Sequence, residues 1–163
     1  MSSSRGDQLQ IYWLPVHALA AVAATAHAVI DWHVGLFGAS SSVLTPTQAG
    51  IAIGMSLITG FWVLGIGLAA RGEARGHATV LVIALLWAFL GNGLVIAACP
   101  PPCADGFPYQ DLTHVGSLVF GAGATWVSWK QLRQSGSTPT WLMPTLTFAV
   151  IAVVFVLEAS VAG

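Results

Sequence analysis

The sequence predicts an all-α fold: a polytopic membrane bundle of five transmembrane helices, with a cytoplasmic N-terminus and the C-terminus outside. Only 7% of the 163 residues are charged and 56% are hydrophobic, whereas soluble domains are about 25% charged. Five apolar segments approach or exceed the roughly 20 residues that cross a bilayer core, and none shows the alternation of about ten residues that marks barrel strands. The expected spans are residues 11–37, 48–70, 78–98, 112–129 and 141–161.

The basic residues orient the bundle. With a cytoplasmic N-terminus all of them fall on the cytoplasmic side, as the positive-inside rule requires: Arg5, Arg71, Arg75, Lys130 and Arg133. A formal net charge of -1 gives no reason to expect a nucleic-acid partner. The first span is too long, and too rich in acid and histidine, for a cleavable signal peptide. We therefore expect an integral protein of a bacterial inner (plasma) membrane, in contact with the lipid bilayer.

The first part of the chain is a polar tail, residues 1–10, which we expect to be disordered. It precedes a single transmembrane domain, residues 11–163. In the first span, small and polar residues recur every three or four positions along one stripe, and this stripe should face the bundle centre because small residues let helices approach closely in lipid. The stripe consists of His17, Ala20, Ala24, His27 and Asp31. We expect His17 to bond across to another helix.

The second span begins near Thr47, which we expect to cap the helix. Gly50 and Gly54 lie four residues apart in it, a spacing that would permit helix–helix association, including a homodimer. The inner loop that follows, residues 71–76, is short. It therefore makes the second and third spans antiparallel neighbours.

The outer loop after the third span carries Cys99 and Cys103. We expect them to form a disulfide that braces a lid, because disulfides persist outside the cell and free thiols there are unusual. The three prolines between them work against this, since polyproline geometry would separate the two residues by roughly 12 Å and a disulfide needs Cα atoms within about 7 Å. A cis X–Pro bond or a tight turn would have to fold the loop back. Redox relay to a quinone is the alternative, although enzymes of that kind usually carry a second cysteine pair.

Polar groups of several spans are expected to gather in the outer half of the membrane, below this loop. The span directions place Asn92 there, with Asp111 and His114 one turn apart at the outer start of the fourth span. Asn92 is costly in lipid unless it is paired, so it either joins helices or lines a cavity. Asp111 complements the helix dipole or belongs to the site. His114 is either a buried hydrogen-bonding partner or a member of the site.

His27 and Asp31 are the strongest candidates for chemistry. They lie four residues apart on one helix face, where they can share a proton, and ionisable groups inside a membrane are expensive and usually functional. Coupled acid and imidazole groups can pass a proton to and from a substrate near neutral pH. The alternative is a structural pair that neutralises itself inside the bundle.

The residues around this pair carry a resemblance. The run His-Ala-Val-Ile-Asp-Trp, which begins at His27, resembles the histidine-plus-acid motif that opens the emopamil-binding protein (EXPERA) superfamily, whose members include sterol isomerases and sigma-type receptors. The second span, from Gly54 onward, is compatible with that family's second helix. Spans one to four would correspond to its four-helix core.

The resemblance implies roles for individual residues. His27 and Asp31 would shuttle protons to and from a sterol double bond, and Trp62 and Trp87 would stabilise the cationic intermediate. Ser56 stands where the isomerases have a glutamate. Sterol isomerisation itself does not follow, and a proton-initiated reaction on another isoprenoid is equally compatible.

Together these observations predict a membrane-embedded isomerase or cyclase that acts on a carbon–carbon double bond of a lipophilic, isoprenoid or sterol-like small molecule. The catalytic residues would be His27 and Asp31, and no cofactor or metal is expected. The residues expected to bind the substrate are Ser56, Trp62, Trp87, Asn92, Asp111 and His114.

Three other functions remain open at this point. The first is a module that binds or transports a lipophilic ligand without chemistry. The second is an accessory subunit of a larger membrane complex, in which the polar groups serve helix contacts. The third is a membrane subunit that binds a metal or haem, since histidines and acids in one layer could ligate zinc, copper or iron. Haem would need axial ligands such as His27 and His114. No compact signature of the HExxH kind is present.

Overall fold

Helices make up the regular secondary structure of every part of the chain described by the computed structural model, which covers residues 15, 17, 18, 45–98, 108–135 and 139–162. The elements are α2 (Pro46–Ala70), α3 (Ala74–Ile83), the π-helix η2 (Ala84–Gly91), α4 (Asn92–Ala98), α5 (Pro108–Gln134) and α6 (Leu142–Ala162). The all-α prediction is confirmed for these residues. The tail of residues 1–10 and most of the first span, residues 11–37, lie outside them.

The α2 helix begins with a capping box. The hydroxyl oxygen of Thr45 accepts a hydrogen bond from the backbone N–H of Gln48 at 3.2 Å, and the side-chain oxygen of Gln48 accepts one from the backbone N–H of Thr45 at 2.9 Å. This arrangement satisfies two helix-terminal donors reciprocally. The expected cap at Thr47 was therefore wrong. Pro46 at the first helical position has a backbone angle suited to a helix and starts the helix before Thr47.

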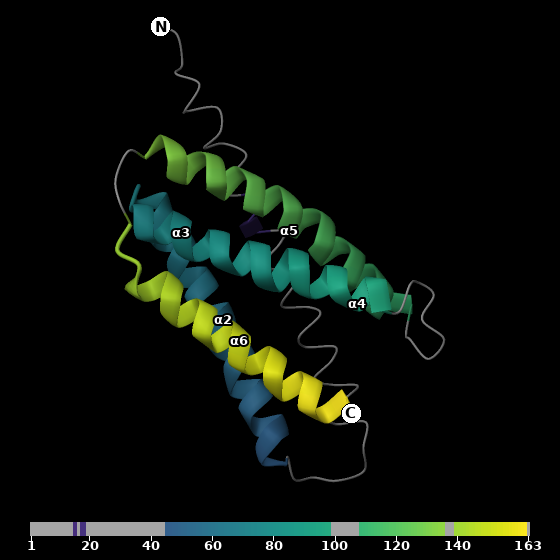
Figure 1. The fold of residues 1–163 in the computed structure, drawn as a ribbon. Helices are drawn as coiled ribbons and strands as arrows, with labels where there is room; N and C mark the ends of the chain where they lie inside the picture. The colour runs from purple at the N-terminus through teal and green to yellow at the C-terminus, as the bar shows by residue number, and fades with distance from the viewer. Residues whose placement is uncertain (1–14, 16, 19–44, 99–107, 136–138, 163) are drawn as a thin grey trace, which may run out of the picture.

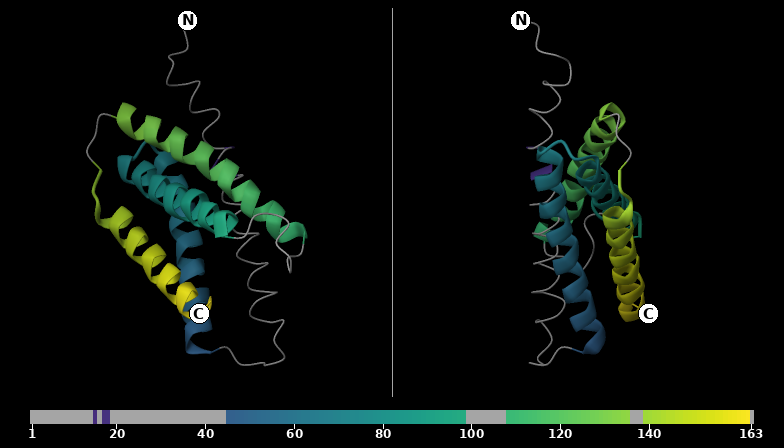
Figure 2. Two further views of the ribbon diagram at one scale, coloured as in Figure 1. Left: turned by 45° about the vertical axis from the view of Figure 1, so that its right-hand side comes forward. Right: turned by 90° about the vertical axis from the view of Figure 1, so that its left-hand side faces the viewer.

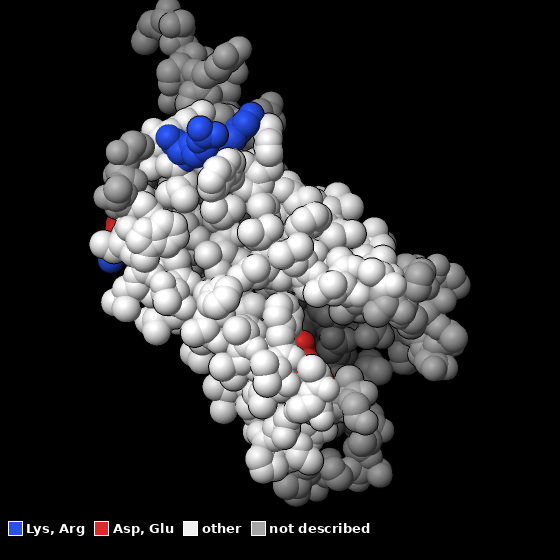
Figure 3. Space-filling view, in the orientation of Figure 1, with Lys and Arg blue, Asp and Glu red and all other residues white. Residues whose placement is uncertain are grey.

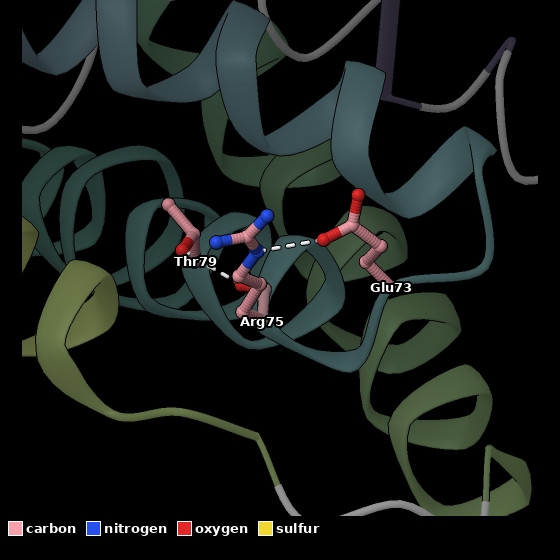
Figure 4. Close-up of polar contacts among 3 residues, drawn as sticks. All are labelled: Glu73, Arg75 and Thr79. Carbon is pink, nitrogen blue, oxygen red and sulfur yellow. Dashed lines mark hydrogen bonds and ion pairs between the residues drawn. The ribbon is translucent and has the colours of Figure 1, made fainter.

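The α2 and α3 helices form a tight antiparallel hairpin, as the short loop predicts. Gly72 in the turn has a φ of 78°, a left-handed conformation that glycine adopts without strain. A methyl group at Gly76 would come within 2.7 Å of the backbone carbonyl oxygen of Gly65 in α2. At the start of α3, Arg75 pairs with Glu73 at 2.7 Å, and the Thr79 hydroxyl donates to the Arg75 carbonyl at 2.8 Å (Figure 4).

The continuous helical run from α3 through η2 to α4 lies at the centre of the bundle. It contacts α2, α5 and α6, and Figures 1 and 2 show it between α5 on one side and α6 on the other. A single apolar core joins these helices. Its most buried members include Ile58, Trp62, Val80, Ile83, Ala84, Ala88, Ala124, Ile151 and Val154.

Gly50 and Gly54 of α2 pack against α6 of the same chain. A methyl group at Gly54 would overlap the Cγ2 atom of Val154 in α6, and one at Gly50 would lie 3.1 Å from the Cδ1 atom of Leu157. The α6 helix therefore occupies the face of α2 on which a homodimer was expected to rest. The structure gives the homodimer no support.

Three of the described helices are long and apolar enough to cross a membrane: Pro46–Ala70, Ala74–Leu94 and Leu142–Ser160. They correspond to three of the expected spans, residues 48–70, 78–98 and 141–161. The fourth expected span, residues 112–129, lies within α5, which is helical throughout but is not among the three. These helices agree with an integral membrane protein.

The outer surface of the bundle fits a lipid environment. Large apolar side chains are exposed along the helices, including Ile53, Val63, Leu94, Val119, Val153 and Val156. Such exposure over several helices is unusual for a soluble protein. The face in Figure 3 is almost free of charge between its ends, and the basic side chains of α5 gather at its upper end. Lipid contact accounts for both features.

Candidate functional site

The most distinctive polar site in the described residues lies where η2 ends and α4 begins. Asn92 follows the π-helical segment directly and is 4% exposed. Its side-chain nitrogen lies 3.1 Å from the carbonyl oxygens of both Trp87 and Ala88. Segments of π-helix inside α-helices are frequent at functional sites. The wide turn here is stabilised by a side-chain donor that comes from the next turn of the same helical run.

Asn92 also joins this helical run to α5. Its side-chain oxygen lies 2.9 Å from Nδ1 of His114, which is 7% exposed. Close packing of the two helices permits the contact, since a methyl group at Gly121 of α5 would come within 2.7 Å of the Ala88 side chain. The structure therefore brings together two of the residues that the sequence places in one polar layer, Asn92 and His114.

The two candidate tryptophans are both core residues. Trp87 stacks on Phe155 of α6, with ring centroids 5.6 Å apart and an angle of 16° between the planes. Trp62 is 2% exposed and belongs to the same apolar cluster. Its buried indole N–H has no hydrogen-bond partner among the described residues. Trp87 precedes Asn92 by five residues, so its ring and the polar site belong to the same stretch of helix.

Ser56 is placed apart from this core. It lies on the exposed side of α2, and its hydroxyl donates to the Ala52 carbonyl at 2.9 Å. Such bonds between a serine and the preceding turn of its own helix are common and satisfy the hydroxyl locally. The structure thus shows no contact between Ser56 and the Asn92–His114 pair.

Several of the predicted site residues lie outside the described part of the chain. They are the pair His27 and Asp31 and both cysteines, Cys99 and Cys103. Asp111 falls within the first turns of α5, but its side chain is not described. The acid–base pair and the disulfide therefore stay predictions.

A second buried polar pair links His17 to α5. The hydroxyl of Ser128 and Nε2 of His17 are hydrogen-bonded at 2.6 Å, and both side chains are fully buried. This confirms the expected bond from His17 to another helix. Its partner could not be predicted, because a lone serine 111 residues away carries no signal in a sequence rich in small residues.

Among the side chains that the structure describes, no group of three or more His, Cys, Asp or Glu residues could hold a metal ion. An apolar surface groove of about 210 Å³ lies between α3 and α6, away from Asn92 and His114, and is lined by Val82, Trp141, Pro144, Thr145 and Phe148.

No protein-family model matches this chain, and no curated protein or solved structure matches it either.

Proposed function

We propose that this chain is a five-span protein of a bacterial inner membrane, with a cytoplasmic N-terminus, that moves protons to and from a lipophilic substrate. The substrate class is an isoprenoid or sterol-like molecule with a carbon–carbon double bond. The observation that carries the proposal is the buried hydrogen bond between Asn92 and His114, which holds an imidazole inside an apolar bundle. Polar and ionisable groups are retained in such surroundings mainly where they have a function.

The charge distribution supports the proposed orientation. Arg71 and Arg75 lie at the turn between α2 and α3, and Lys130 and Arg133 lie in the last turns of α5. These two regions lie at the same end of the bundle (Figure 1). Under the positive-inside rule this end faces the cytoplasm.

The proposed chemistry is a proton relay that leaves the protein unchanged. An acid donates a proton to one carbon of the double bond, and the other carbon becomes a cation. A base then removes a proton from a neighbouring carbon, which re-forms a double bond one position away. Transfer of that proton from the base to the acid restores both groups to their starting states. His27 and Asp31 are the proposed acid and base, and His114 is a further imidazole for the relay.

The apolar core fits the demands of such an intermediate. A carbocation in contact with water would be trapped as an alcohol, so the reaction needs a site from which water is excluded. Trp62 and Trp87 are the proposed rings whose faces would stabilise the positive charge. The resemblance of the His27–Asp31 run to the emopamil-binding protein superfamily supports the same reaction class.

Solvent deuterium transfer tests this proposal without knowledge of the product. The full-length protein, purified in mild detergent, is incubated in heavy water with squalene, a carotenoid and an unsaturated sterol as separate probes. We expect deuterium on a carbon of one probe, detected by mass spectrometry, and a loss of at least tenfold in His27→Ala and in His114→Ala. Thr125→Val is the matched control, because among the described residues the Thr125 hydroxyl bonds only to the Gly121 carbonyl of its own helix.

The same preparation separates the proposal from its alternatives. A co-purified lipid without any deuterium transfer to the three probes or to that lipid would contradict catalysis and favour a binding or transport module. Stoichiometric metal or haem in native mass spectra would favour the metal-binding subunit. Transfer that persists at full rate in His27→Ala would remove the proposed pair from the reaction.

A further inference from the structure

We propose that Asn92 is a positioning residue that holds His114 in one tautomer, with the proton on Nδ1 and the basic lone pair on Nε2. This inference deepens the proposed function and rests on it for the role of Nε2 as proton acceptor. The tautomer itself can be measured independently of any activity. Three hydrogen bonds of the Asn92 side chain, at the end of the π-helical segment Ala84–Gly91, determine this tautomer.

The hydrogen bonds of the Asn92 amide fix the direction in which it points. One end of the amide lies 3.1 Å from the carbonyl oxygens of Trp87 and Ala88. Carbonyl oxygens only accept hydrogen bonds, so the NH₂ group must be the end that faces them. The amide oxygen is thereby directed at His114. The two carbonyls together decide an orientation that the shape of an amide alone leaves ambiguous.

The orientation of the amide decides which nitrogen of the His114 imidazole carries the proton. The Asn92 oxygen has only lone pairs to offer, and Nδ1 of His114 lies 2.9 Å from it. Nδ1 must therefore donate, and it carries the proton in the neutral ring. In that tautomer the lone pair lies on Nε2, at the opposite side of the ring. Any proton that the neutral ring accepts is accepted there.

The π-helical segment ends directly before Asn92. The backbone N–H of Asn92 bonds to the carbonyl of Phe89, only three residues back. The Asn92 side-chain nitrogen lies 3.1 Å from the carbonyl oxygens of Trp87 and Ala88, within the π-helical segment that ends at Gly91. The backbone of this segment thus presents both acceptors to the same amide. A group that holds an imidazole in one tautomer decides which ring nitrogen can accept a proton, which is the role of orienting groups in known acid–base sites.

Nitrogen NMR of the full-length protein tests the tautomer directly. The protein is labelled with ¹⁵N-histidine, and the His114 signals are identified as those missing from His114→Gln. We expect one His114 nitrogen at the shift of a protonated nitrogen and one at that of an unprotonated nitrogen, with the proton on Nδ1. A proton on Nε2 in the wild-type protein would overturn the inference, and this measurement requires no variant at Asn92.

Replacing Asn92 tests its positioning role. Asn92→Leu has a similar volume but neither an acceptor for Nδ1 nor a donor for the carbonyls, so we expect His114 to become a mixture of tautomers and any deuterium transfer to fall at least tenfold. Thr125→Val should retain the wild-type spectrum. An unchanged His114 tautomer in a folded Asn92→Leu protein would refute the positioning role. A wild-type Nδ1–H tautomer that is lost in Asn92→Leu, in a protein without transfer activity, would support the inference and contradict only the proposed function.

Discussion

Gly54 of α2 lies so close to Val154 of α6 that a methyl group at Gly54 would overlap the Cγ2 atom of the valine. Small residues at such points let helix backbones approach in lipid, where van der Waals packing is a main source of helix association. The contact lies in the apolar core, because Val154 is fully buried. It therefore ties the last described helix of the chain to α2.

Gly54→Ala should destabilise the protein by about 1–3 kcal/mol, because an extra carbon in a packed core forces its neighbours to shift. Gly60→Ala in the same helix is the matched control, since a methyl group there would meet nothing within 4 Å. Alanine at that position should be neutral or stabilise by roughly 0.5–1 kcal/mol through helix propensity. The free energy of unfolding in mixed micelles measures both, and equal values for the two variants would contradict the packing.

Val154→Ala combined with Gly54→Ala should recover part of the lost stability, because it removes the Cγ2 atom that the new methyl group meets. The comparison is a double-mutant cycle of two residues in contact, for which non-additivity is expected. Strict additivity of the two substitutions would show that the two positions do not touch.

Ser128→Ala should lower the free energy of unfolding by about 1 kcal/mol, a typical value for a hydrogen bond between helices in a membrane. The substitution removes the hydroxyl that lies 2.6 Å from Nε2 of His17. Ser135→Ala is the control, because the Ser135 hydroxyl bonds to the Leu132 carbonyl near the end of the same helix and to no other described residue. If both variants unfold alike, the pair of His17 and Ser128 contributes nothing to the stability of the bundle.

The proposed orientation predicts where reporter proteins will be active. Alkaline phosphatase, which folds only outside the cytoplasm, should be active when fused after residue 163 or within residues 99–107. Green fluorescent protein should fluoresce when fused at residues 136–138. The opposite pattern would show that the bundle has the opposite orientation in the membrane. Activity of both reporters at one end would contradict the proposed number of spans.

Cys99 and Cys103 are predicted to form a disulfide. Under non-reducing conditions a maleimide should label neither Cys99 nor Cys103 in the unfolded protein, whereas two labels per chain should appear after reduction. Mass spectrometry distinguishes the states by the added mass. Two labels without reduction would show that both thiols are free and would contradict the disulfide.

The local features of the chain could be predicted without the structure. Helical spans at residues 48–70, 78–98 and 141–161 follow from hydropathy and length alone, because a helix satisfies its own backbone in lipid whatever its neighbours are. The α2–α3 hairpin follows from the short loop between two such spans. The bond from His17 to another helix could be anticipated from the cost of an unpaired imidazole in the bundle, but its partner could not.

What only the tertiary structure decided is which side chains meet. The Asn92–His114 bond depends on the π-helical segment Ala84–Gly91, whose wider turn changes the direction of every side chain after it. A hydropathy pattern carries no record of that turn, since the segment is apolar on all sides. Likewise, Gly50 and Gly54 have a spacing that suits any close helix contact, and the selection of α6 as their partner depends on how all the helices pack at once. The sequence by itself thus determined that the chain is helical, and three of the spans it predicts are helices long and apolar enough to cross a membrane. Only the packing of these helices decided how the buried polar groups are paired.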